Sequence, residues 1–284
     1  ENDVDVIIGT DPDCDRVGIV VRDADGVYRT LTGNQTGALL VEYILRSKQE
    51  QGTLPKDGVV IKTIVTTELA AEIAKSYGIE TMNVFTGFKY IGEKMTEFAE
   101  KKNHTYLIGF EESYGYLIGT HARDKDGVVA SMLIAEMAAY YKTKGMSLYE
   151  AMQEVYKKYG YFAEQTNAYT MPGKDGMERM ASILAGLRDN KPVAVNGLNI
   201  AKTTDYLNQT ITDDKGNTEP LIGLPKSNVL RYDLSDGKSY FIVRPSGTEP
   251  KIKLYMGTSS DSMESATAIL NGIASDAEKQ FGLI

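Results

Sequence analysis

Residues 59–65 read Val-Val-Ile-Lys-Thr-Ile-Val, a run of seven in which five are aliphatic. A run of this length and β-branched composition predicts a strand buried on both faces. After it, residues 68–77 and 89–102 carry apolar side chains at helical spacing, whereas 79–85 and 105–110 are short apolar runs typical of strands. This alternation predicts an α/β domain in three layers, with a mixed, mainly parallel sheet covered by helices on both faces.

Further segments extend this pattern in both directions. Val4 to Ile8 is a short apolar run that predicts a strand near the start of the chain. Residues 128–143 align apolar side chains on one helical face. Ser147 and Glu150 then have the spacing of a capping box, which predicts a helix as far as about residue 158.

The sequence changes in character after Tyr161. Short strands and turns that contain Gly and Pro replace the long alternating segments, and helices are expected near 175–188 and 261–281. Residues 213–217, Asp-Asp-Lys-Gly-Asn, are typical of a hairpin turn. These features predict a separate, smaller α+β domain whose boundary lies near residues 145–162.

Length and composition limit the classes of protein that fit. A chain of 284 residues suffices for about two domains, and 42% hydrophobic with 25% charged residues is typical of a globular protein. The net charge of -8 argues against a nucleic-acid partner, although local Arg and Lys residues can still bind an anionic substrate. Nothing in the sequence defines the oligomeric state.

The compartment is indicated by what the sequence contains. Cys14 is the single cysteine, which excludes an internal disulfide and fits a reducing, cytoplasmic environment. No run approaches the roughly 20 apolar residues of a membrane span and no signal peptide is visible, so we expect no membrane partner. Because the chain starts at Glu1 and enters a strand almost at once, we expect it to be part of a longer protein.

The loop Gly9-Thr10-Asp11-Pro12-Asp13-Cys14-Asp15-Arg16 lies between two apolar runs. Three carboxylates at alternate positions repel one another, and a hard divalent cation such as Mg²⁺ relieves the repulsion while gaining the oxygen ligands it prefers. The alternative is a polar turn, in which Asp is also common. An EF-hand is excluded because its sixth and twelfth positions, normally Gly and Glu, are Arg16 and Arg22.

A second polar segment, Gly109-Phe110-Glu111-Glu112-Ser113-Tyr114-Gly115, comes at the end of a strand. Open α/β sheets bind ligands at the carboxyl ends of their strands. Paired carboxylates beside a hydroxyl suit hydrogen bonding to sugar hydroxyls, and a solvated loop explains the spacing equally well. Another strand is followed by Phe85-Thr86-Gly87-Phe88-Lys89, which by itself is only a weak indication of a binding site.

The segment Arg244-Pro245-Ser246-Gly247-Thr248-Glu249-Pro250 lies between strands expected at 240–243 and 252–256. An Arg fork, two hydroxyls and a Gly that lets backbone amides approach favour an anion site over a plain hairpin turn. No helix follows, so this is not a P-loop. The cations of a further segment, 121–127, could contact phosphate or form salt bridges at the start of a helix. His104 is expected to end the helix at 89–102, where a cation is favourable.

Taken together, these segments resemble the motifs of the α-D-phosphohexomutases, in the order in which that family has them. The resemblance implies that Asp11, Asp13 and Asp15 bind Mg²⁺, and that Arg16 and Lys125 act in the active site. The residues that it assigns to binding a small phosphosugar are Thr86, Gly87, Glu111, Ser113, Arg244, Ser246, Gly247 and Thr248.

The resemblance also implies a domain plan. Residues 1–31 would end the family's second domain, 32–150 would form its sugar-binding third domain, and 160–284 its phosphate-binding fourth domain. The family's first domain carries a serine that becomes phosphorylated, in a loop of the Thr-Ala-Ser-His-Asn type, and no such loop occurs in these residues. We therefore expect the segment to be inactive alone and to bind metal more weakly, because the phosphoserine is the remaining metal ligand.

The implied activity is that of an intramolecular phosphotransferase of the isomerase class. The Glu-Glu-Ser and Thr-Gly-Phe-Lys motifs are closer to phosphoglucomutases, which implies interconversion of glucose 1-phosphate and glucose 6-phosphate. The reaction would use an enzyme phosphoserine, with glucose 1,6-bisphosphate as intermediate and activator. Phosphomannomutase, phosphopentomutase and a non-catalytic phosphosugar-binding module are the alternatives. A haloacid-dehalogenase-type phosphatase fits poorly, because its plan has no place for the third Asp, Arg16 or the 244–250 loop.

Overall fold

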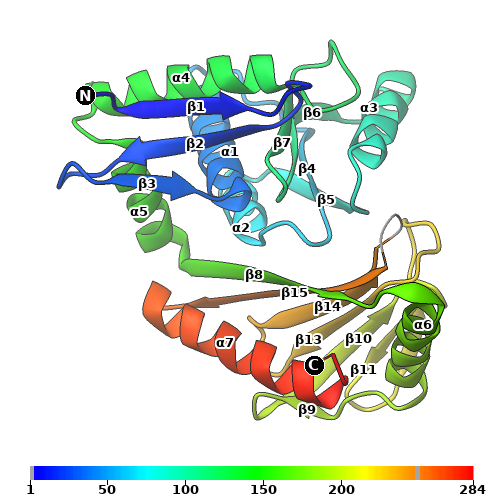
Figure 1. Cartoon of the computed structure of the whole chain (residues 1–284). Helices are drawn as coiled ribbons and strands as arrows, with labels where there is room; N and C mark the ends of the chain where they lie inside the picture. The colour runs from blue at the N-terminus through cyan, green and yellow to red at the C-terminus, as the bar shows by residue number, and fades with distance from the viewer. Residues whose placement is uncertain (1–2, 247–249, 284) are drawn as a thin grey trace. The chain divides into compact units, whose positions relative to one another are not determined.

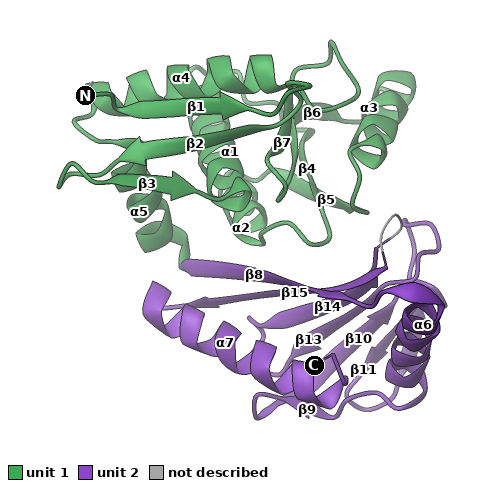
Figure 2. Ribbon diagram, viewed as in Figure 1, with its two compact units in different colours: residues 1–160 green, residues 161–284 purple. Residues whose placement is uncertain are grey.

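The computed structural model describes residues 3–246 and 250–283. They form two compact units, residues 1–160 and 161–284 (Figure 2). The first contains a mainly parallel sheet with helices, and the second an antiparallel sheet with helices. This confirms the expected fold class, an α/β domain followed by a smaller α+β domain. The finer division at residues 31 and 150 stays a prediction.

A four-stranded sheet in the order β5-β4-β6-β7 forms the centre of the first unit (Figure 1). The central strand β4 (Gly58–Thr63) pairs in parallel with β5 (Glu80–Val84) and with β6 (Thr105–Glu111). The last strand, β7 (Gly115–Ile118), is antiparallel to β6. All six residues of β4 are buried. Its residues Val59 to Ile61 are a continuous apolar run and do not alternate with polar residues, because both faces of the strand are covered.

Helices cover both faces of this sheet. The helices of this unit are α1 (Gly33–Glu50), α2 (Leu69–Ser76), α3 (Lys89–Lys101), α4 (Gly127–Thr143) and α5 (Leu148–Tyr159). Gly37 of α1 lies against Phe110 of β6, whereas the preceding strand residue, Gly109, lies against Ile91 of α3. Successive residues of a strand point to opposite faces, so α1 and α3 form the two outer layers.

The helices expected from periodicity begin and end within two residues of their predicted bounds, and the capping box of Ser147 and Glu150 is present. Helix α1 was not expected from the sequence, and nearly every residue from Gly33 to Leu45 is buried in it. The expectation for His104 is wrong: α3 ends at Lys101, and His104 lies beyond it with Nε2 3.5 Å from Glu80 Oε2.

A separate antiparallel sheet opens the first unit, formed by β1 (Val6–Thr10), β2 (Val17–Arg22) and β3 (Tyr28–Leu31). It meets the central sheet through an isolated bridge between Arg16 and Gly115. Helix α4 runs alongside β1 (Figure 1). The β1–β2 loop therefore lies beside both the first turn of α4 and the tip of the β6–β7 hairpin.

The second unit is an antiparallel sheet in the order β12-β11-β10-β13-β14-β15-β8, with β9 paired to β10. Its strands are β8 (Tyr161–Thr170), β9 (Ala194–Val195), β10 (Leu198–Asp205), β11 (Thr210–Asp213), β12 (Thr218–Pro220), β13 (Leu230–Leu234), β14 (Tyr240–Pro245) and β15 (Lys251–Ser260). The β11–β12 turn confirms the hairpin expected at 213–217.

The core of the second unit lies between this sheet and the helices α6 (Gly173–Asp189) and α7 (Met263–Gln280). Leu184 of α6 and Ile273 of α7 belong to the same buried cluster as Phe241 of β14. Helices on an antiparallel sheet give the α+β arrangement. Among the described residues, no helix of either unit has the length and apolar character needed to cross a membrane.

Candidate active site

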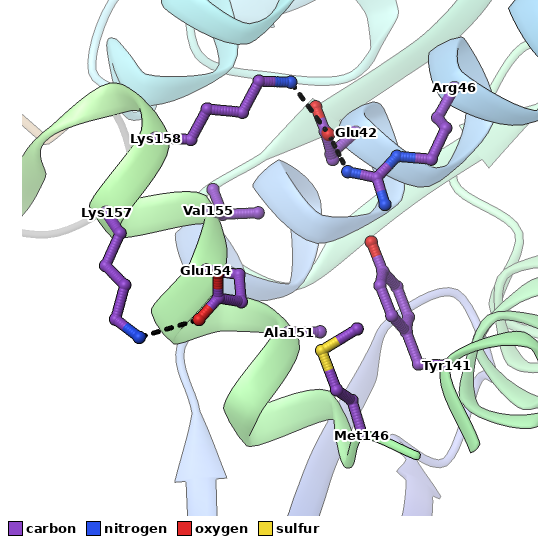
Figure 3. Close-up of a pocket in the computed structure, with 9 residues that line it drawn as sticks. All are labelled: Glu42, Arg46, Tyr141, Met146, Ala151, Glu154, Val155, Lys157 and Lys158. Atoms are coloured by element: carbon purple, nitrogen blue, oxygen red, sulfur yellow. Dashed lines mark hydrogen bonds and ion pairs between the residues drawn. The ribbon is translucent and has the colours of Figure 1, made fainter. Parts of the chain in front are cut away.

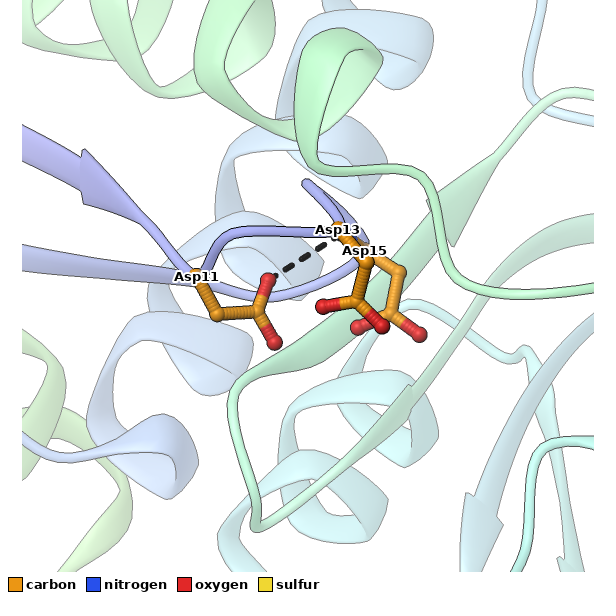
Figure 4. Close-up of side chains that lie close together, drawn as sticks. All are labelled: Asp11, Asp13 and Asp15. Carbon is orange, nitrogen blue, oxygen red and sulfur yellow. Dashed lines mark hydrogen bonds between the residues drawn. The ribbon is translucent and has the colours of Figure 1, made fainter.

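The β1–β2 loop brings its three carboxylates together. One carboxylate oxygen from each of Asp11, Asp13 and Asp15 lies within 4.8 Å of the other two (Figure 4). Asp11 and Asp15 are half-buried and Asp13 is exposed. Carboxylate oxygens are the donors that Mg²⁺ prefers, so the chemistry of this set fits that ion.

Backbone hydrogen bonds shape the loop. Asp11 Oδ1 accepts from the amides of Asp15 at 3.2 Å and Arg16 at 3.1 Å. The Arg16 amide contributes most to holding the pKa of Asp11 below its usual value. Cys14 adopts a left-handed conformation with φ of 57°, and its amide donates to Asp11 O at 3.0 Å. The curled backbone places the side chains at alternate positions on one side, with Asp11 ionised.

The first turn of α4 anchors the same loop. The Gly127 amide donates to Cys14 O at 3.1 Å. A Cβ on Gly127 would lie 2.7 Å from that oxygen, which is closer than real Cβ contacts allow. Only glycine permits this approach without moving the loop. The position of the carboxylates therefore depends on a residue more than a hundred positions away in the sequence.

Lys125 links the acidic loop to the segment before α4. Its Nζ lies 2.9 Å from Asp15 Oδ2 and 2.9 Å from Asp124 Oδ1, and its side chain is 13% exposed. Burial lowers the pKa of Lys125, but the hydrogen bonds to Asp15 and Asp124 outweigh it, and the pKa is raised. The lysine stem crosses Gly115, where a Cβ would lie 2.4 Å from Lys125 Cδ. A charged ammonium group is thus held beside the three carboxylates.

His121, in the same segment, belongs to the start of the helix. Its Nε2 lies 2.8 Å from Asp126 Oδ2. Asp126 is the N-cap of α4, and its Oδ1 accepts from the amides of Val128 at 2.8 Å and Val129 at 3.0 Å. The structure shows the salt-bridge alternative for residues 121–127: Lys125 pairs with Asp15 and Asp124, and His121 is hydrogen-bonded to the N-cap residue Asp126. Contact of these side chains with phosphate stays a prediction.

Glu111 and Gly87 meet at the carboxyl ends of β6 and β5. Glu111 is 7% exposed, and its Oε1 accepts from the Gly87 amide at 2.7 Å. Burial raises the pKa of Glu111, and the charge of Glu112 adds to this, while Lys125 and Arg16 oppose it. Gly87 has φ of 115°, which favours glycine. The structure thereby brings the Thr86–Gly87 and Glu111–Ser113 segments to one edge of the sheet.

Glu112 points elsewhere. Its Oε2 accepts from Thr63 Oγ1 at 3.3 Å and from Thr66 Oγ1 at 3.2 Å, at the end of β4. The two adjacent carboxylates, interpreted from the sequence as a pair for sugar hydroxyls, therefore diverge. Thr63 and Thr66 were not among the expected site residues, although hydroxyls at and just after the end of a buried parallel strand are a signal that could have found them.

The 244–250 segment lies in the second unit. Arg244 and Pro245 still belong to β14, two residues beyond the predicted end of that strand. Arg244 Nη1 donates to Tyr255 OH at 3.4 Å, and the Ser246 amide donates to Lys251 O at 2.7 Å. Gly247 and Thr248 lie outside the described residues. Arg244 and Ser246 are thus placed at the end of a hairpin strand, both half-buried.

Two known domains account for most of the chain. "Phosphoglucomutase/phosphomannomutase, alpha/beta/alpha domain III" matches residues 32–159, and "Phosphoglucomutase/phosphomannomutase, C-terminal domain" matches residues 188–268. The chain belongs to the phosphoglucomutase/phosphomannomutase family. The resemblance to the phosphohexomutases that the motifs indicated is thereby confirmed.

Curated members of this family are similar to the chain over most of its length. The phosphoglucomutase of Staphylococcus haemolyticus is 34% identical over 277 residues, which cover 97% of this chain and 49% of that protein. The phosphoglucomutase of Staphylococcus epidermidis is 37% identical over 91% of this chain and 46% of its own length. The chain spans about half the length of the curated relatives it matches.

A solved structure shows the same fold. The structure of pp63/parafusin, a phosphoglucomutase from Paramecium, aligns with a TM-score of 0.63 at 20% identity, over 98% of this chain and 46% of its own. At this level of identity the likeness concerns the fold alone.

One hollow of this phosphohexomutase chain adjoins the acidic loop. It has a volume of about 560 Å³ and extends from the face of the three-stranded sheet to Asp11, Arg16 and Tyr114. The remaining lining residues are Ile7, Gly9, Thr10, Gly18, Ile19, Val20 and Thr30. Small and apolar side chains thus border the loop on this side.

A second cavity, of about 480 Å³, lies among α1, α4 and α5 (Figure 3). Its buried Glu42 is bonded by Arg46 at 2.5 Å and by Lys158 at 3.4 Å, and Lys157 pairs with Glu154 at 2.7 Å. Tyr141 lines this cavity and lies 14 residues after Gly127 in α4. At 1.5 Å per residue, the two residues are about 21 Å apart along the helix. It therefore lies apart from the candidate active site, and its Glu42–Lys158 ion pair joins α1 to α5.

Proposed function

We propose that the complete protein containing this chain is a phosphoglucomutase, which interconverts glucose 1-phosphate and glucose 6-phosphate. One observation carries the proposal: in a member of this family, three clustered carboxylates, Lys125 and the Glu111–Gly87 contact come from separate strands and loops of one compact unit. Acid, ammonium and sugar-binding groups are what phosphoryl transfer on a sugar requires.

Each group has a proposed task. Mg²⁺, held by Asp11, Asp13 and Asp15, would neutralise charge on the transferring phosphoryl group. Asp11 Oδ1 and Asp15 Oδ2 already have partners, so their second oxygens and the exposed Asp13 are the donors that remain for a metal. Lys125 and Arg16 hold positive charge next to this loop, where they attract the phosphate oxygens.

Sugar and phosphate binding fall to the remaining residues. Glu111 accepts hydrogen bonds from sugar hydroxyls, Ser113 adds a hydroxyl, and the Thr86–Gly87 segment orients the ring. The phosphate-binding residues of the second unit are Arg244, Ser246, Gly247 and Thr248. Glucose 1,6-bisphosphate is the proposed intermediate and activator. We choose glucose over other sugars because the staphylococcal relatives are phosphoglucomutases.

The test is a coupled assay of the complete protein with Mg²⁺ and glucose 1,6-bisphosphate. Glucose 1-phosphate should be the best substrate, ahead of mannose 1-phosphate and ribose 1-phosphate. The chain by itself should bind sugar phosphate without turning it over, because the proposed reaction needs a phosphoserine that these residues do not supply. Preference for mannose 1-phosphate would overturn the assignment of the sugar, and absence of turnover with any of the three would overturn the assignment as a mutase.

A further inference from the structure

Glu112 is next to a proposed sugar-binding residue, yet its carboxylate enters a buried cluster behind the site. Thr63 and Thr66, whose hydroxyls reach its Oε2, are both fully buried. Their own oxygens lie 2.7 Å apart, so the three side chains form a triangle of contacts within hydrogen-bonding distance. The two hydroxyl protons can make two hydrogen bonds at a time, and the carboxylate, with no proton to give, must be an acceptor.

The backbone of Glu112 is confined from the other side by α1. A Cβ on Gly33, in the first turn of that helix, would lie 2.1 Å from Glu112 O and 2.9 Å from the Tyr114 amide. The helix start therefore packs directly on the turn that joins β6 to β7. The side chain of Glu112 is thus hydrogen-bonded at the end of β4, and its backbone packs against the start of α1.

This turn is tight and strained. Glu111 and Gly115 are the last paired residues of the β6–β7 hairpin, so only Glu112, Ser113 and Tyr114 form the turn. Tyr114 adopts φ of 68°, a left-handed conformation that side chains other than glycine disfavour. Strained turns of this kind persist when surrounding contacts hold them, and the triangle with Thr63 and Thr66 is such a contact.

We infer that Glu112 is a positioning residue: through Thr63 and Thr66 it fixes the hairpin turn so that Glu111 stays bonded to Gly87 and Ser113 faces the sugar. The role of the turn in sugar binding rests on the function proposed above. The adjacent carboxylates thus divide two tasks, one toward the ligand and one toward the scaffold. Groups that bind substrate lose much of their effect when displaced by about 1 Å, so such an anchor affects binding without touching the ligand.

The first test measures amide hydrogen exchange at Gly87 in this 284-residue chain, because this amide reports the Glu111 contact. Glu112→Ala should accelerate Gly87 exchange about tenfold or more, since the lost bonds involve a charged group. Glu112→Gln, which can still accept from a hydroxyl, should restore most of the protection. Glu72→Ala removes an exposed carboxylate of the same unit and should leave Gly87 unchanged. The inference is overturned if Gly87 keeps its protection in Glu112→Ala, or if the buried amides of β4 accelerate equally.

The second test measures kinetics in the complete protein. Glu112→Ala should lower kcat/KM for glucose 1-phosphate about 10- to 100-fold, mainly through KM, and Glu112→Gln should recover it. Thr66→Val should have a smaller effect, and adding it to Glu112→Ala should cost little more, because both act through one cluster. Unchanged KM in Glu112→Ala overturns the positioning role. A wild-type protein without turnover refutes the proposed function instead, and leaves the exchange result at Gly87 to decide on Glu112.

Discussion

The acidic loop at residues 11–16 and the segment at residues 244–250 are both short connections between antiparallel strands, but they are held differently. The acidic loop is bonded to Lys125 and Gly127, more than a hundred positions along the chain. In the described part of the second segment, Arg244 and Ser246 are bonded to Tyr255 and Lys251, within 11 positions and on the adjoining strand, whereas Pro250 O accepts from the Met171 amide, 79 positions away, at 2.8 Å. The proposed metal ligands are thus held by distant parts of their unit, whereas Arg244 and Ser246 are held by the neighbouring strand of their own hairpin.

This difference has consequences for how each site responds to substitution. A loop whose shape depends on distant contacts should lose its metal-binding geometry when a remote residue is substituted. A segment carried on a hairpin should respond mainly to changes in its own side chains, and its unit should keep folding when they are removed. The following predictions test this contrast, from the largest expected effect to the smallest.

Asp13→Asn in the complete protein should show the largest effect. It removes one charge from the proposed metal site, where several kcal/mol of charge stabilisation are at stake, so kcat should fall about 100- to 1000-fold. Steady-state kinetics over a range of Mg²⁺ concentrations measure this. Wild-type activity at every Mg²⁺ concentration tested would show that the cluster is only a polar turn.

Arg244→Ala should raise KM for the sugar phosphate about 10- to 150-fold, which corresponds to losing a charge-assisted hydrogen bond. Arg244→Lys should recover only part of the loss, because Lys lacks the planar fork. Far-UV circular dichroism should be unchanged in both variants, since the contacts of Arg244 are local. If KM and kcat stay at wild-type values in Arg244→Ala, the segment has no part in the active site.

Gly127→Ala should disturb the acidic loop from a distance. Its Cβ would lie 2.7 Å from Cys14 O, and overpacking of this kind costs about 1–3 kcal/mol, or several degrees in Tm. Gly186→Ala is the matched control in the second unit, because nothing lies within 4 Å of its added Cβ and its φ is ordinary. That control should raise Tm slightly, as alanine favours a helix interior. Equal Tm changes in the two variants would contradict the long-range anchoring of the loop.

Mg²⁺ should raise the Tm of the chain by a few degrees. At a tenfold excess over Kd, linkage contributes about 1.4 kcal/mol. Asp13→Asn should abolish the increase, and Gly127→Ala should reduce it, because both affect the same carboxylate group. Thermal denaturation with and without Mg²⁺ measures the effect. A response that survives in Asp13→Asn would place the ion elsewhere.

Glu111→Gln should produce the smallest effect on stability, in the stabilising direction at neutral pH. Burial raises the folded-state pKa of Glu111, so its ionised form disfavours folding, and this penalty disappears as pH falls through the folded pKa. The stability advantage of the variant should therefore shrink on acidification. Urea unfolding at neutral and acidic pH tests this; an advantage that grows toward acidic pH would show that the sign is wrong. Activity should fall regardless, because the proposed sugar contact is weakened.

The sequence alone determined most of the helices, the central strands of the first unit and the acidic cluster. Residues 59–65 predicted a buried parallel strand because their apolar run is local, and the strand–helix alternation around it led to the correct fold class. Asp11, Asp13 and Asp15 could be grouped for the same reason, since residues within one five-residue stretch cannot be far apart. The motifs sufficed for the family, whereas α1, which is buried along most of its length, was not expected from the sequence.

Only the tertiary structure decided where the adjacent carboxylates point and what holds the loops. In a continuous strand, alternation would place Glu111 and Glu112 on opposite faces. Because the strand pairing ends at Glu111, however, the direction of Glu112 is set by the turn, and the left-handed conformation of Tyr114 in that turn cannot be predicted from its residue type. The bonds from Glu112 to Thr63 and from Lys125 to Asp15 join residues 49 and 110 positions apart. Such contacts arise from the packing of strands and helices against one another, and residue type constrains them too weakly to predict them from the sequence.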